Sequence, residues 1–293
     1  MKLLDGKIVK AKIAEHLKAE VVNLVVKPKM VILQVGDLPE SNAYIAQKKK
    51  FAEEIGAEVV HQNYANDVTS FEIIVDIRKL NIDSSVHGII LQLPVPKNLN
   101  ASDLIDEINP QKDVDGMTST NLKKLAQNRT DGFVPATTSG IMSLLGFYNV
   151  ELEGKKVLMI GRSMLVGKPT ALALLNKNAT VSIAHSKTKN LPELSREQDV
   201  VIVAIGNPRF VTEEYFSSNQ IVVDVGINLE KVGLKEEIDG PQKTKLVGDV
   251  DFENVKDIVG AISPVPGGVG AMTVAALFEN LVKACQLQNK GVI

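Results

Sequence analysis

The chain contains 293 residues, 44% of them hydrophobic and 23% charged, with a formal net charge of −2. This length leaves room for two domains, each with its own core. The balanced charge and an aromatic content of 4%, without tryptophan, argue against a nucleic-acid partner or an anionic membrane surface. No apolar run has the length of a membrane span, and the amphipathic N-terminus is unlike a signal peptide, so we expect a cytoplasmic protein.

Residues that bind metals are few and scattered. The only cysteine, Cys285, has no partner for a disulfide, and its simplest interpretation is a buried residue on an apolar C-terminal helix. The four histidines show no paired spacing. We therefore expect no bound metal ion.

Apolar, β-branched runs alternate with segments of helical periodicity along the chain. The expected strands lie at residues 30–35, 58–63, 86–93, 157–160, 180–184, 200–205 and 221–225. The expected helices lie at residues 41–55, 69–80, 102–108, 139–147, 168–176 and 271–288. This alternation predicts an α/β fold with parallel sheets. We expect two domains, one of residues 1–138 completed by the C-terminal helix at 271–293, the other of residues 139–270, with the Asp- and Gly-rich segment 109–138 as their junction.

The helix expected from Ser41, a plausible N-cap, carries a lysine on its apolar side. Tyr44, Lys48, Phe51 and Ile55 recur at helical spacing and share one stripe. A buried lysine loses its charge readily, so Lys48 beside Tyr44 is a candidate catalytic pair in a cleft. The alternative is a lysine whose stem lies on the core while its amine reaches water.

Three further segments place polar or small residues where ligands gather. Gln92 lies at the carboxyl end of the strand at 86–93, where sites on open α/β sheets form, although a capping amide fits equally well. The turn Asp113-Val114-Asp115-Gly116 is of a kind that is usually structural. The loop Ser263-Pro264-Val265-Pro266-Gly267-Gly268-Val269-Gly270 predicts either a close backbone approach to a ligand or a rigid connector between domains.

The second half contains a candidate phosphate-binding loop. The strand at 157–160 runs into Gly161, and a helix is expected to begin near Gly167, with Pro169 in its first turn. Glycine lets the backbone approach a pyrophosphate, and the helix N-terminus favours its charge. The spacing departs from GxGxxG, so a plain strand–helix turn is the alternative. With its flanking strands, the loop predicts a Rossmann-type domain that binds a nicotinamide dinucleotide.

The end of the next strand distinguishes between two dinucleotides. NAD enzymes of this fold usually carry an acid there for the ribose 2′-hydroxyl, whereas this chain reads His185-Ser186-Lys187-Thr188. Arg162, Ser186 and Lys187 offer donors for a 2′-phosphate instead, although Lys187 fits a solvated turn equally well. We therefore predict NADP as the cofactor.

A set of segments, in order along nearly the whole chain, resembles the bifunctional methylenetetrahydrofolate dehydrogenase/cyclohydrolase family, often called the FolD family. They read SNAYIAQKKK, LQLPVP, KDVDG, GRSMLVGKP, AHSKT, DVGIN and SPVPGGVGAMT. The resemblance implies an N-terminal catalytic domain, an NADP-binding Rossmann domain, a cleft between them and a homodimer. It also implies a role in one-carbon metabolism and purine biosynthesis, with tetrahydrofolate derivatives as substrates of an oxidation and a hydrolysis.

The resemblance further implies roles for individual residues. Lys48 is similar to the family's central catalytic lysine, Tyr44 to its neighbour over the folate, and Gln92 to the partner that tunes the lysine. Asp115 is similar to the acid that hydrogen-bonds the pterin ring. The other residues implied to bind ligands are Pro264, Gly267 and Gly268 for the folate, and Arg162, Ser163, Ser186 and Ile227 for the nucleotide.

The chain departs from the family at Ala136 and Thr138, where the family usually has Cys and Pro, and at Ala271, where it usually has Pro. These changes touch the junction and a helix start, and none of the candidate catalytic groups. Two other functions fit a two-domain plan: a dehydrogenase of the shikimate or amino-acid type, or a non-enzymatic NADPH-binding sensor. The first calls for a carboxylate clamp, yet no arginine occurs within residues 1–77. The second does not require Lys48, Gln92 and Asp115 together.

Overall fold

The computed structural model describes residues 1–232 and 243–289, which form two compact units. The three-stranded unit, named after its sheet, comprises Lys10–Ser139 and Val274–Ile293, and the six-stranded unit comprises Met1–Val9 and Gly140–Thr273. The chain passes between them inside three helices, α1 (Gly6–Val22), α6 (Ala136–Phe147) and α10 (Val269–Gln288). The domain limits expected from the sequence concern the binding of folate and NADP, and they stay a prediction.

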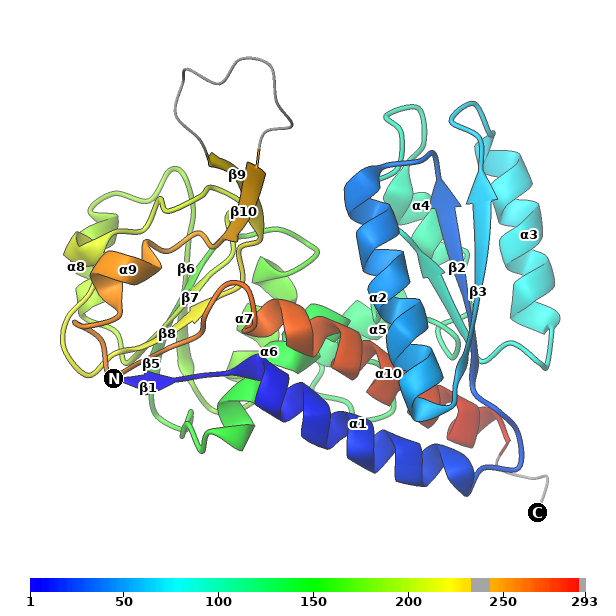
Figure 1. Cartoon of the computed structure of the whole chain (residues 1–293), viewed down its shortest axis with the longest axis horizontal. Helices are drawn as coiled ribbons and strands as arrows, with labels where there is room; N and C mark the ends of the chain where they lie inside the picture. Colours follow the sequence, from blue (N-terminus) through cyan, green and yellow to red (C-terminus); the bar gives the residue numbers. More distant parts are fainter. Residues whose placement is uncertain (233–242, 290–293) are drawn as a thin grey trace. The chain divides into compact units, whose positions relative to one another are not determined.

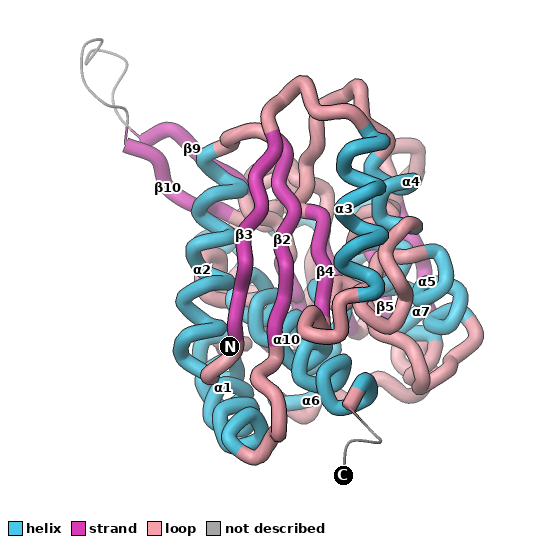
Figure 2. Tube along the Cα trace, turned by 90° about the vertical axis from the view of Figure 1, so that its right-hand side faces the viewer, coloured by secondary structure: helices cyan, strands magenta, loops and turns pink. Residues whose placement is uncertain are grey.

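The three-stranded unit has a parallel sheet with the order β3-β2-β4. Its strands are β2 (Lys29–Val35), β3 (Glu58–Tyr64) and β4 (Gly88–Leu91). Helix α2 lies on one face of the sheet and helix α3 on the other, with the short α4 beside α3 (Figures 1 and 2). The bounds of the helices are α2 (Pro39–Ile55), α3 (Ser70–Ile82), α4 (Ala101–Asp106) and α5 (Ser119–Ala126).

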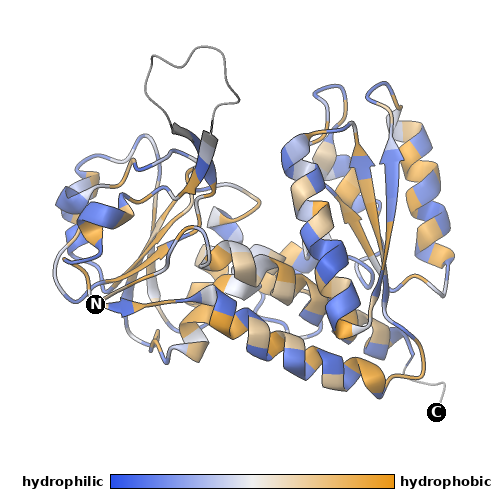
Figure 3. Cartoon of the chain, viewed as in Figure 1, coloured by the Kyte–Doolittle hydropathy of each residue, from blue (hydrophilic) through white to orange (hydrophobic). Residues whose placement is uncertain are grey.

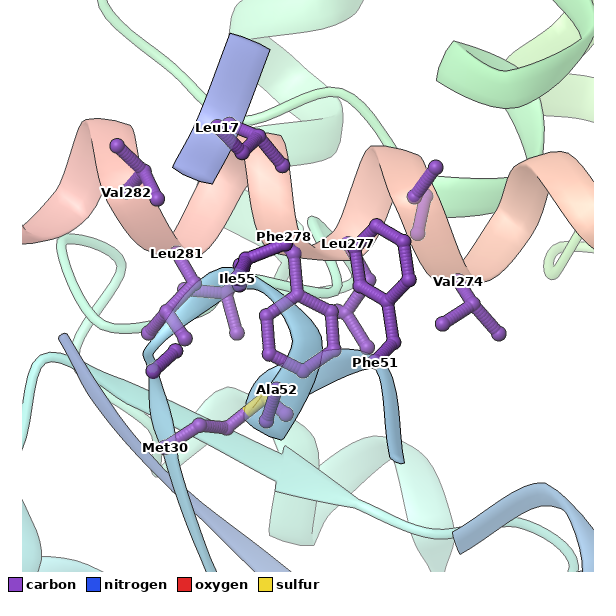
Figure 4. Close-up of a cluster of buried hydrophobic side chains, with 14 of the residues drawn as sticks. Leu17, Met30, Phe51, Ala52, Ile55, Val274, Leu277, Phe278, Leu281 and Val282 are labelled. Carbon is purple, nitrogen blue, oxygen red and sulfur yellow. The ribbon is translucent and has the colours of Figure 1, made fainter. Parts of the chain in front are cut away.

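Two hydrophobic cores cover the two faces of β2. Met30 and Ile32 pack with Phe51 of α2 and Phe278 of α10, whose ring centroids are 5.3 Å apart (Figure 4). The intervening residues of the strand belong to a second core with α3 and α4. Since successive side chains point to opposite faces and each face carries a core, β2 is apolar except at Lys29 and Gln34, whereas α3 mixes hydrophobic and hydrophilic residues (Figure 3).

The six-stranded unit has a parallel sheet with the order β1-β11-β8-β7-β5-β6. Its strands are β1 (Lys2–Leu3), β5 (Lys156–Ile160), β6 (Thr180–Ala184), β7 (Val200–Val203), β8 (Ile221–Asp224) and β11 (Ala261–Ile262). The other elements are α7 (Gly167–Leu175), α8 (Leu191–Arg196), the 3₁₀ helix η1 (Glu213–Tyr215), α9 (Phe252–Val255) and the antiparallel pair β9 (Asn228–Val232) and β10 (Lys243–Val247). Strand β6 lies on one side of β5 and β7 on the other, so the order reverses there, and open parallel sheets bind ligands at such a switch point.

Every strand and helix expected from the sequence occurs, with ends shifted by a few residues. The N-cap prediction at Ser41 is wrong, because α2 begins at Pro39 after Leu38 and Ser41 is buried inside the helix. Proline fits the first helical position because its missing N–H has no partner there. The expected junction segment, 109–138, contains α5 and the start of α6. Cys285 is buried in α10, as predicted.

The elements that the sequence did not predict are α1, α5, α8, η1, α9, β1, β9, β10 and β11. Strands β1 and β11 have two residues each and no pattern of their own, and they exist through pairing with each other and with β8. Within residues 1–232 and 243–289, no helix combines the length and the apolar character needed to cross a bilayer.

Candidate active site

Lys48 and Gln92 meet in the three-stranded unit. Lys48 lies on α2, one turn after Tyr44, and Gln92 directly follows β4. The Lys48 Nζ donates a hydrogen bond to Gln92 Oε1 at 2.9 Å. Gln92 Nε2 donates to the carbonyl oxygen of Leu93 at 2.9 Å, which turns the amide oxygen toward the lysine. Gln92 therefore caps its own strand end and contacts Lys48 at the same time.

The Lys48 amine has a lowered pKa. Burial is the main cause, because a charged amine loses solvation away from water, and the nearby charge of Asp115 opposes the shift only in part. The hydrogen-bond acceptor of Lys48 is a neutral amide. A charged and a neutral amine can both donate to an amide oxygen, so Lys48 can take up or release a proton and keep this partner.

The apolar stripe of α2 is confirmed. Phe51 and Ile55 are each 1% exposed, while Tyr44 and Lys48 are partly buried and the charged neighbours at 49, 50, 53 and 54 are exposed. Burial raises the pKa of the Tyr44 hydroxyl, so this side chain is neutral at neutral pH. Tyr44 thus presents a ring with a neutral polar end one turn from the amine of Lys48.

The two acids of the 113–116 turn differ in their surroundings. Asp113 is 1% exposed, and its carboxylate accepts hydrogen bonds from two backbone N–H groups and from the side chain of Asn121. The carboxylate of Asp115 accepts no hydrogen bond from any residue that the structure describes. Burial raises the pKa of Asp115, and the charge of Lys48 opposes this shift. The structural interpretation of the turn therefore applies to Asp113, while the acceptor oxygens of Asp115 have no donor among the described residues.

The six-stranded unit holds the glycine loop at the switch point of its sheet. Helix α7 begins at Gly167, as predicted. Gly161 has a φ of 128°, and a Cβ there would overlap the carbonyl oxygen of Ala204 after β7. A Cβ at Gly167 would overlap the carbonyl oxygen of Gly161. Both positions exclude larger residues, which is the packing expected where a backbone must approach a phosphate closely.

The side chain of Ser163 forms hydrogen bonds within the glycine loop. Its Oγ accepts hydrogen bonds from the N–H groups of Val166 at 3.1 Å and Gly167 at 3.3 Å, as a capping side chain does. The hydroxyl proton is left for another acceptor. The sequence placed Ser163 among the nucleotide contacts, and the structure adds this local role in shaping the loop.

The other nucleotide candidates, Arg162, Ser186 and Ile227, are exposed. Arg162 forms no ion pair with any described residue. The turn after β6 is closed by His185 Nδ1, which accepts the N–H of Lys187 at 3.1 Å, and no acid stands there to repel a phosphate. An unpaired exposed guanidinium beside a glycine loop suits a 2′-phosphate.

The loop with Pro264, Gly267 and Gly268 lies between β11 and α10 and is held by the start of the chain. The N–H of Gly6 donates to the carbonyl oxygen of Gly267 at 2.8 Å, and a Cβ at Gly6 would overlap the carbonyl oxygen of Gly268. Ser263 Oγ accepts the N–H of Asp224 at 2.8 Å. The loop is thus fixed at both ends within the six-stranded unit, and its contact with a folate stays a prediction.

Lys48, Tyr44, Gln92 and Asp115 belong to one unit, whereas the loop 263–270 and the nucleotide candidates belong to the other. The sequence prediction overlooked two buried acids of the six-stranded unit, Asp224 and Asp249. A signal existed for Asp224, which ends the apolar strand β8. No group of three or more His, Cys, Asp or Glu side chains in the described ranges is arranged to hold a metal ion.

Comparisons with known proteins match both halves of the chain. Residues 4–115 match the family model described as "Tetrahydrofolate dehydrogenase/cyclohydrolase, catalytic domain", and residues 135–289 match that of the same family's "NAD(P)-binding domain". The "Bifunctional protein FolD" of Campylobacter fetus is 43% identical over 297 residues and is covered at 100%, as is this chain.

Solved structures agree with the family models. The FolD methylenetetrahydrofolate dehydrogenase/cyclohydrolase of Campylobacter jejuni is 41% identical with a TM-score of 0.91, covering 98% of this chain and 99% of that chain. The Trypanosoma brucei enzyme, solved with NADP and an inhibitor, is 30% identical with a TM-score of 0.89, covering 97% of each chain. The chain therefore belongs to the tetrahydrofolate dehydrogenase/cyclohydrolase family.

Proposed function

We propose that the protein oxidises 5,10-methylenetetrahydrofolate to 5,10-methenyltetrahydrofolate with NADP⁺ and hydrolyses the methenyl form to 10-formyltetrahydrofolate. The observation that carries this proposal is the Lys48–Gln92 hydrogen bond, with the charge of Asp115 nearby, in a chain that matches both domain models of the family. It is an NADP-dependent oxidoreductase and hydrolase of one-carbon metabolism.

Lys48 supplies the acid–base chemistry of the hydrolysis. Water adds to the cationic methenyl carbon and loses a proton to the neutral Lys48 amine. The resulting ammonium protonates the nitrogen whose bond to that carbon opens, and the hydroxyl on that carbon loses its proton as the formyl C=O forms, so that one proton is released overall. The lowered pKa of the buried amine makes its neutral form available near neutral pH. Gln92 holds the amine in place in both protonation states.

Asp115 and Tyr44 position the folate in this proposal. A carboxylate can accept two hydrogen bonds, one from the amino group and one from the ring N–H of a pterin. Asp115 suits this role because no described residue donates to it, unlike Asp113. The ring of Tyr44 offers a surface for the folate beside the lysine. We also propose that Pro264, Gly267 and Gly268 contact the folate.

The residues of the six-stranded unit fit NADP. No side chain fits at Gly161 or Gly167, so the loop backbone stays accessible to a pyrophosphate. Exposed Arg162 and Ser186 supply donors for a 2′-phosphate. Ser163 and Ile227 complete the proposed contacts. When bound, NADP⁺ accepts the hydride of the methylene carbon. The protein need only hold the reacting atoms together and exclude water.

The two alternatives are less well supported. A shikimate- or amino-acid-type dehydrogenase would share the two-domain plan, but the chain matches the folate family in both halves. A sensor that only binds NADPH gives no reason for a buried lysine near an acid, Asp115, to which no described residue donates. The folate reactions account for both features.

We also propose a cytoplasmic homodimer. Strand β3 is the outer strand of its sheet, and its Val60 is 38% exposed. Helix α3 of the same unit exposes Phe71 at 73% and Ile82 at 85%. An open strand edge and large exposed apolar side chains favour burial against a second copy. Light scattering should give twice the chain mass at micromolar concentration, and a monomer there contradicts the proposal.

An absorbance assay tests the proposed reactions. Purified protein is mixed with methylenetetrahydrofolate and NADP⁺ or NAD⁺, and NADPH formation and methenyl decay are followed separately. We expect turnover of both steps and a preference for NADP⁺. Binding of NADPH without turnover would favour the sensor. Turnover in a parallel assay with shikimate, but none with the folate, would favour the small-acid dehydrogenase.

A further inference from the structure

Two buried aspartates of the six-stranded unit interlock through two glycines. Asp224, the last residue of β8, is 3% exposed, and Asp249, shortly after β10, is 0% exposed. A Cβ at Gly248 would overlap the carboxylate of Asp224, and a Cβ at Gly226 would overlap the carboxylate of Asp249. Each acid therefore fills the space that a glycine near the other acid leaves, and neither can move alone.

Asp224 holds the backbone on both sides of its partner. Its carboxylate accepts hydrogen bonds from the N–H groups of Asp249 at 3.0 Å and Val250 at 2.9 Å. It also accepts the N–H of Gly226 at 2.9 Å. The segment that carries Asp249 is thereby tied to the end of β8, which determines where the Asp249 carboxylate lies.

Asp249 in turn holds the loop after β7. Its carboxylate accepts the N–H groups of three successive residues, Ile205 at 2.7 Å, Gly206 at 3.0 Å and Asn207 at 2.8 Å. The side chain of Asn228 donates to the same carboxylate at 2.9 Å. Successive N–H groups aimed at one point form an anion-binding nest, and here a carboxylate of the chain itself occupies it.

The loop after β7 forms part of the switch point where a dinucleotide binds. A Cβ at Gly161 in the phosphate loop would overlap the carbonyl oxygen of Ala204, the residue before this turn. Gly206 and Asn207 are exposed, whereas Asp249 is fully buried beneath them. Asp249 therefore cannot touch a ligand, and any effect it has on one must pass through the turn at 205–207.

We propose that Asp249 is a positioning residue for the dinucleotide, which holds the turn at 205–207 in the conformation that receives NADP⁺, and that Asp224 holds Asp249 in place. This inference rests on the proposed NADP-dependent function. It predicts that a change at Asp249 weakens NADP⁺ binding and the dehydrogenase reaction, because hydride transfer needs the cofactor. The hydrolysis of methenyltetrahydrofolate uses Lys48 and not the turn, so it should persist.

The principal test is Asp249→Asn in the full-length protein. Asparagine has nearly the size of aspartate, but its amide NH₂ faces the backbone N–H donors of the turn at 205–207. The turn therefore loses part of the hydrogen bonding that holds it. We expect the Kd for NADP⁺, measured by calorimetry, to rise by about tenfold or more, since hydrogen bonds to a charged group are lost. The KM for NADP⁺ should rise in parallel. Cyclohydrolase turnover should stay within about twofold of the wild-type value.

Gln220→Glu is the matched control. Gln220 is 3% exposed and lies at the opposite end of β8, where its amide donates to the carbonyl oxygens of Ser195 and Gln198 and accepts the N–H of Ser217. Its exchange also mismatches a buried hydrogen-bonding centre of the same unit. We expect a lowered melting temperature and an unchanged Kd for NADP⁺.

Gly206→Ala provides a second variant in case Asp249→Asn does not fold. Gly206 has a φ of 65° with open space around its Cβ position, so alanine strains the exposed turn and creates no clash in the core. We expect weaker NADP⁺ binding with the hydrolysis retained. Equal NADP⁺ affinity in wild type, Gly206→Ala and Asp249→Asn, or a parallel loss of both activities, overturns the inference. A wild type without NADP⁺ turnover overturns the proposed function instead.

Discussion

The Lys48 group of the three-stranded unit and the Asp224–Asp249 pair of the six-stranded unit both bury charge-bearing side chains, but they surround them differently. Among the residues that the structure describes, the Lys48 amine has one hydrogen-bond partner, a neutral amide. Asp249 has four donors, three of them successive backbone N–H groups. One neutral partner lets the Lys48 amine change its protonation state, whereas the donors around Asp249 fix the backbone of the turn at 205–207.

The same contrast appears within the 113–116 turn. Asp113 accepts three hydrogen bonds that hold the turn together. Asp115, two residues later, accepts none from the described residues, and the charge of Lys48 affects its pKa. The number of donors around an acid thus separates a structural residue from a candidate ligand-binding residue. Five predictions can break or sharpen the comparison between the two groups.

Lys48→Met should have the largest effect. We expect cyclohydrolase turnover to fall by about 10²- to 10⁴-fold, the range for a lost general acid–base group. The fold should be retained, because an apolar chain of similar length replaces a buried amine. Lys49→Met, at an exposed position of the same helix, is the control and should remain active. Near-normal conversion of methenyl- to formyltetrahydrofolate by Lys48→Met contradicts the assignment.

Asp115→Asn should lower kcat/KM for the folate by roughly 10- to 100-fold, since an amide turns a donor toward a pterin donor. Binding of NADP⁺ should be unchanged. The charge of Asp115 raises the pKa of Lys48, so its loss should move the limb of the pH profile that reports Lys48 to lower pH.

Asp113→Asn completes this comparison. It mismatches an acid with three donors, so we expect a fall in melting temperature that Asp115→Asn does not show. Equal destabilisation by the two variants would show that the donor count does not separate their roles.

Arg162→Ala should weaken NADP⁺ binding by about tenfold, within the range for a charge-assisted hydrogen bond at an exposed site. The Kd for NAD⁺, which lacks the 2′-phosphate, serves as the internal control and should hardly change. Calorimetry with both cofactors measures the ratio. If both affinities fall together, Arg162 acts on the loop and not on the phosphate.

The pH dependence of stability should show the smallest effect. Burial raises the pKa of Asp224 from 3.8 to about 7, against the hydrogen bonds from three backbone N–H groups. Between these two values the folded chain keeps a proton that the unfolded chain releases, so stability falls as pH rises toward 7 and then levels off. From pH 6 to 7 the loss is about 1 kcal/mol. Urea unfolding at several pH values should show this slope, and Asp224→Asn should remove it.

The sequence predicted β4 and β7 because their apolar runs are continuous, as two-sided burial requires. It missed β1 and β11, whose existence depends on pairing with distant segments, and the antiparallel pair β9 and β10. It misplaced the start of α2 because serine at a plausible cap competed with proline at the true first turn. Thr69, by contrast, caps α3 with a local capping box, and there the predicted start was off by one residue.

By itself, the sequence determined the α/β class, the apolar stripe that carries Lys48, the start of α7 at Gly167 and the ordered motifs of a folate enzyme. These depend on periodicity and local backbone chemistry, which act over a few residues. Only the tertiary structure decided that Lys48 donates to Gln92, 44 positions away, and that Asp249 holds a turn 42 to 44 positions before it. No short-range pattern encodes such partners, because folding brings them together through the strands between them.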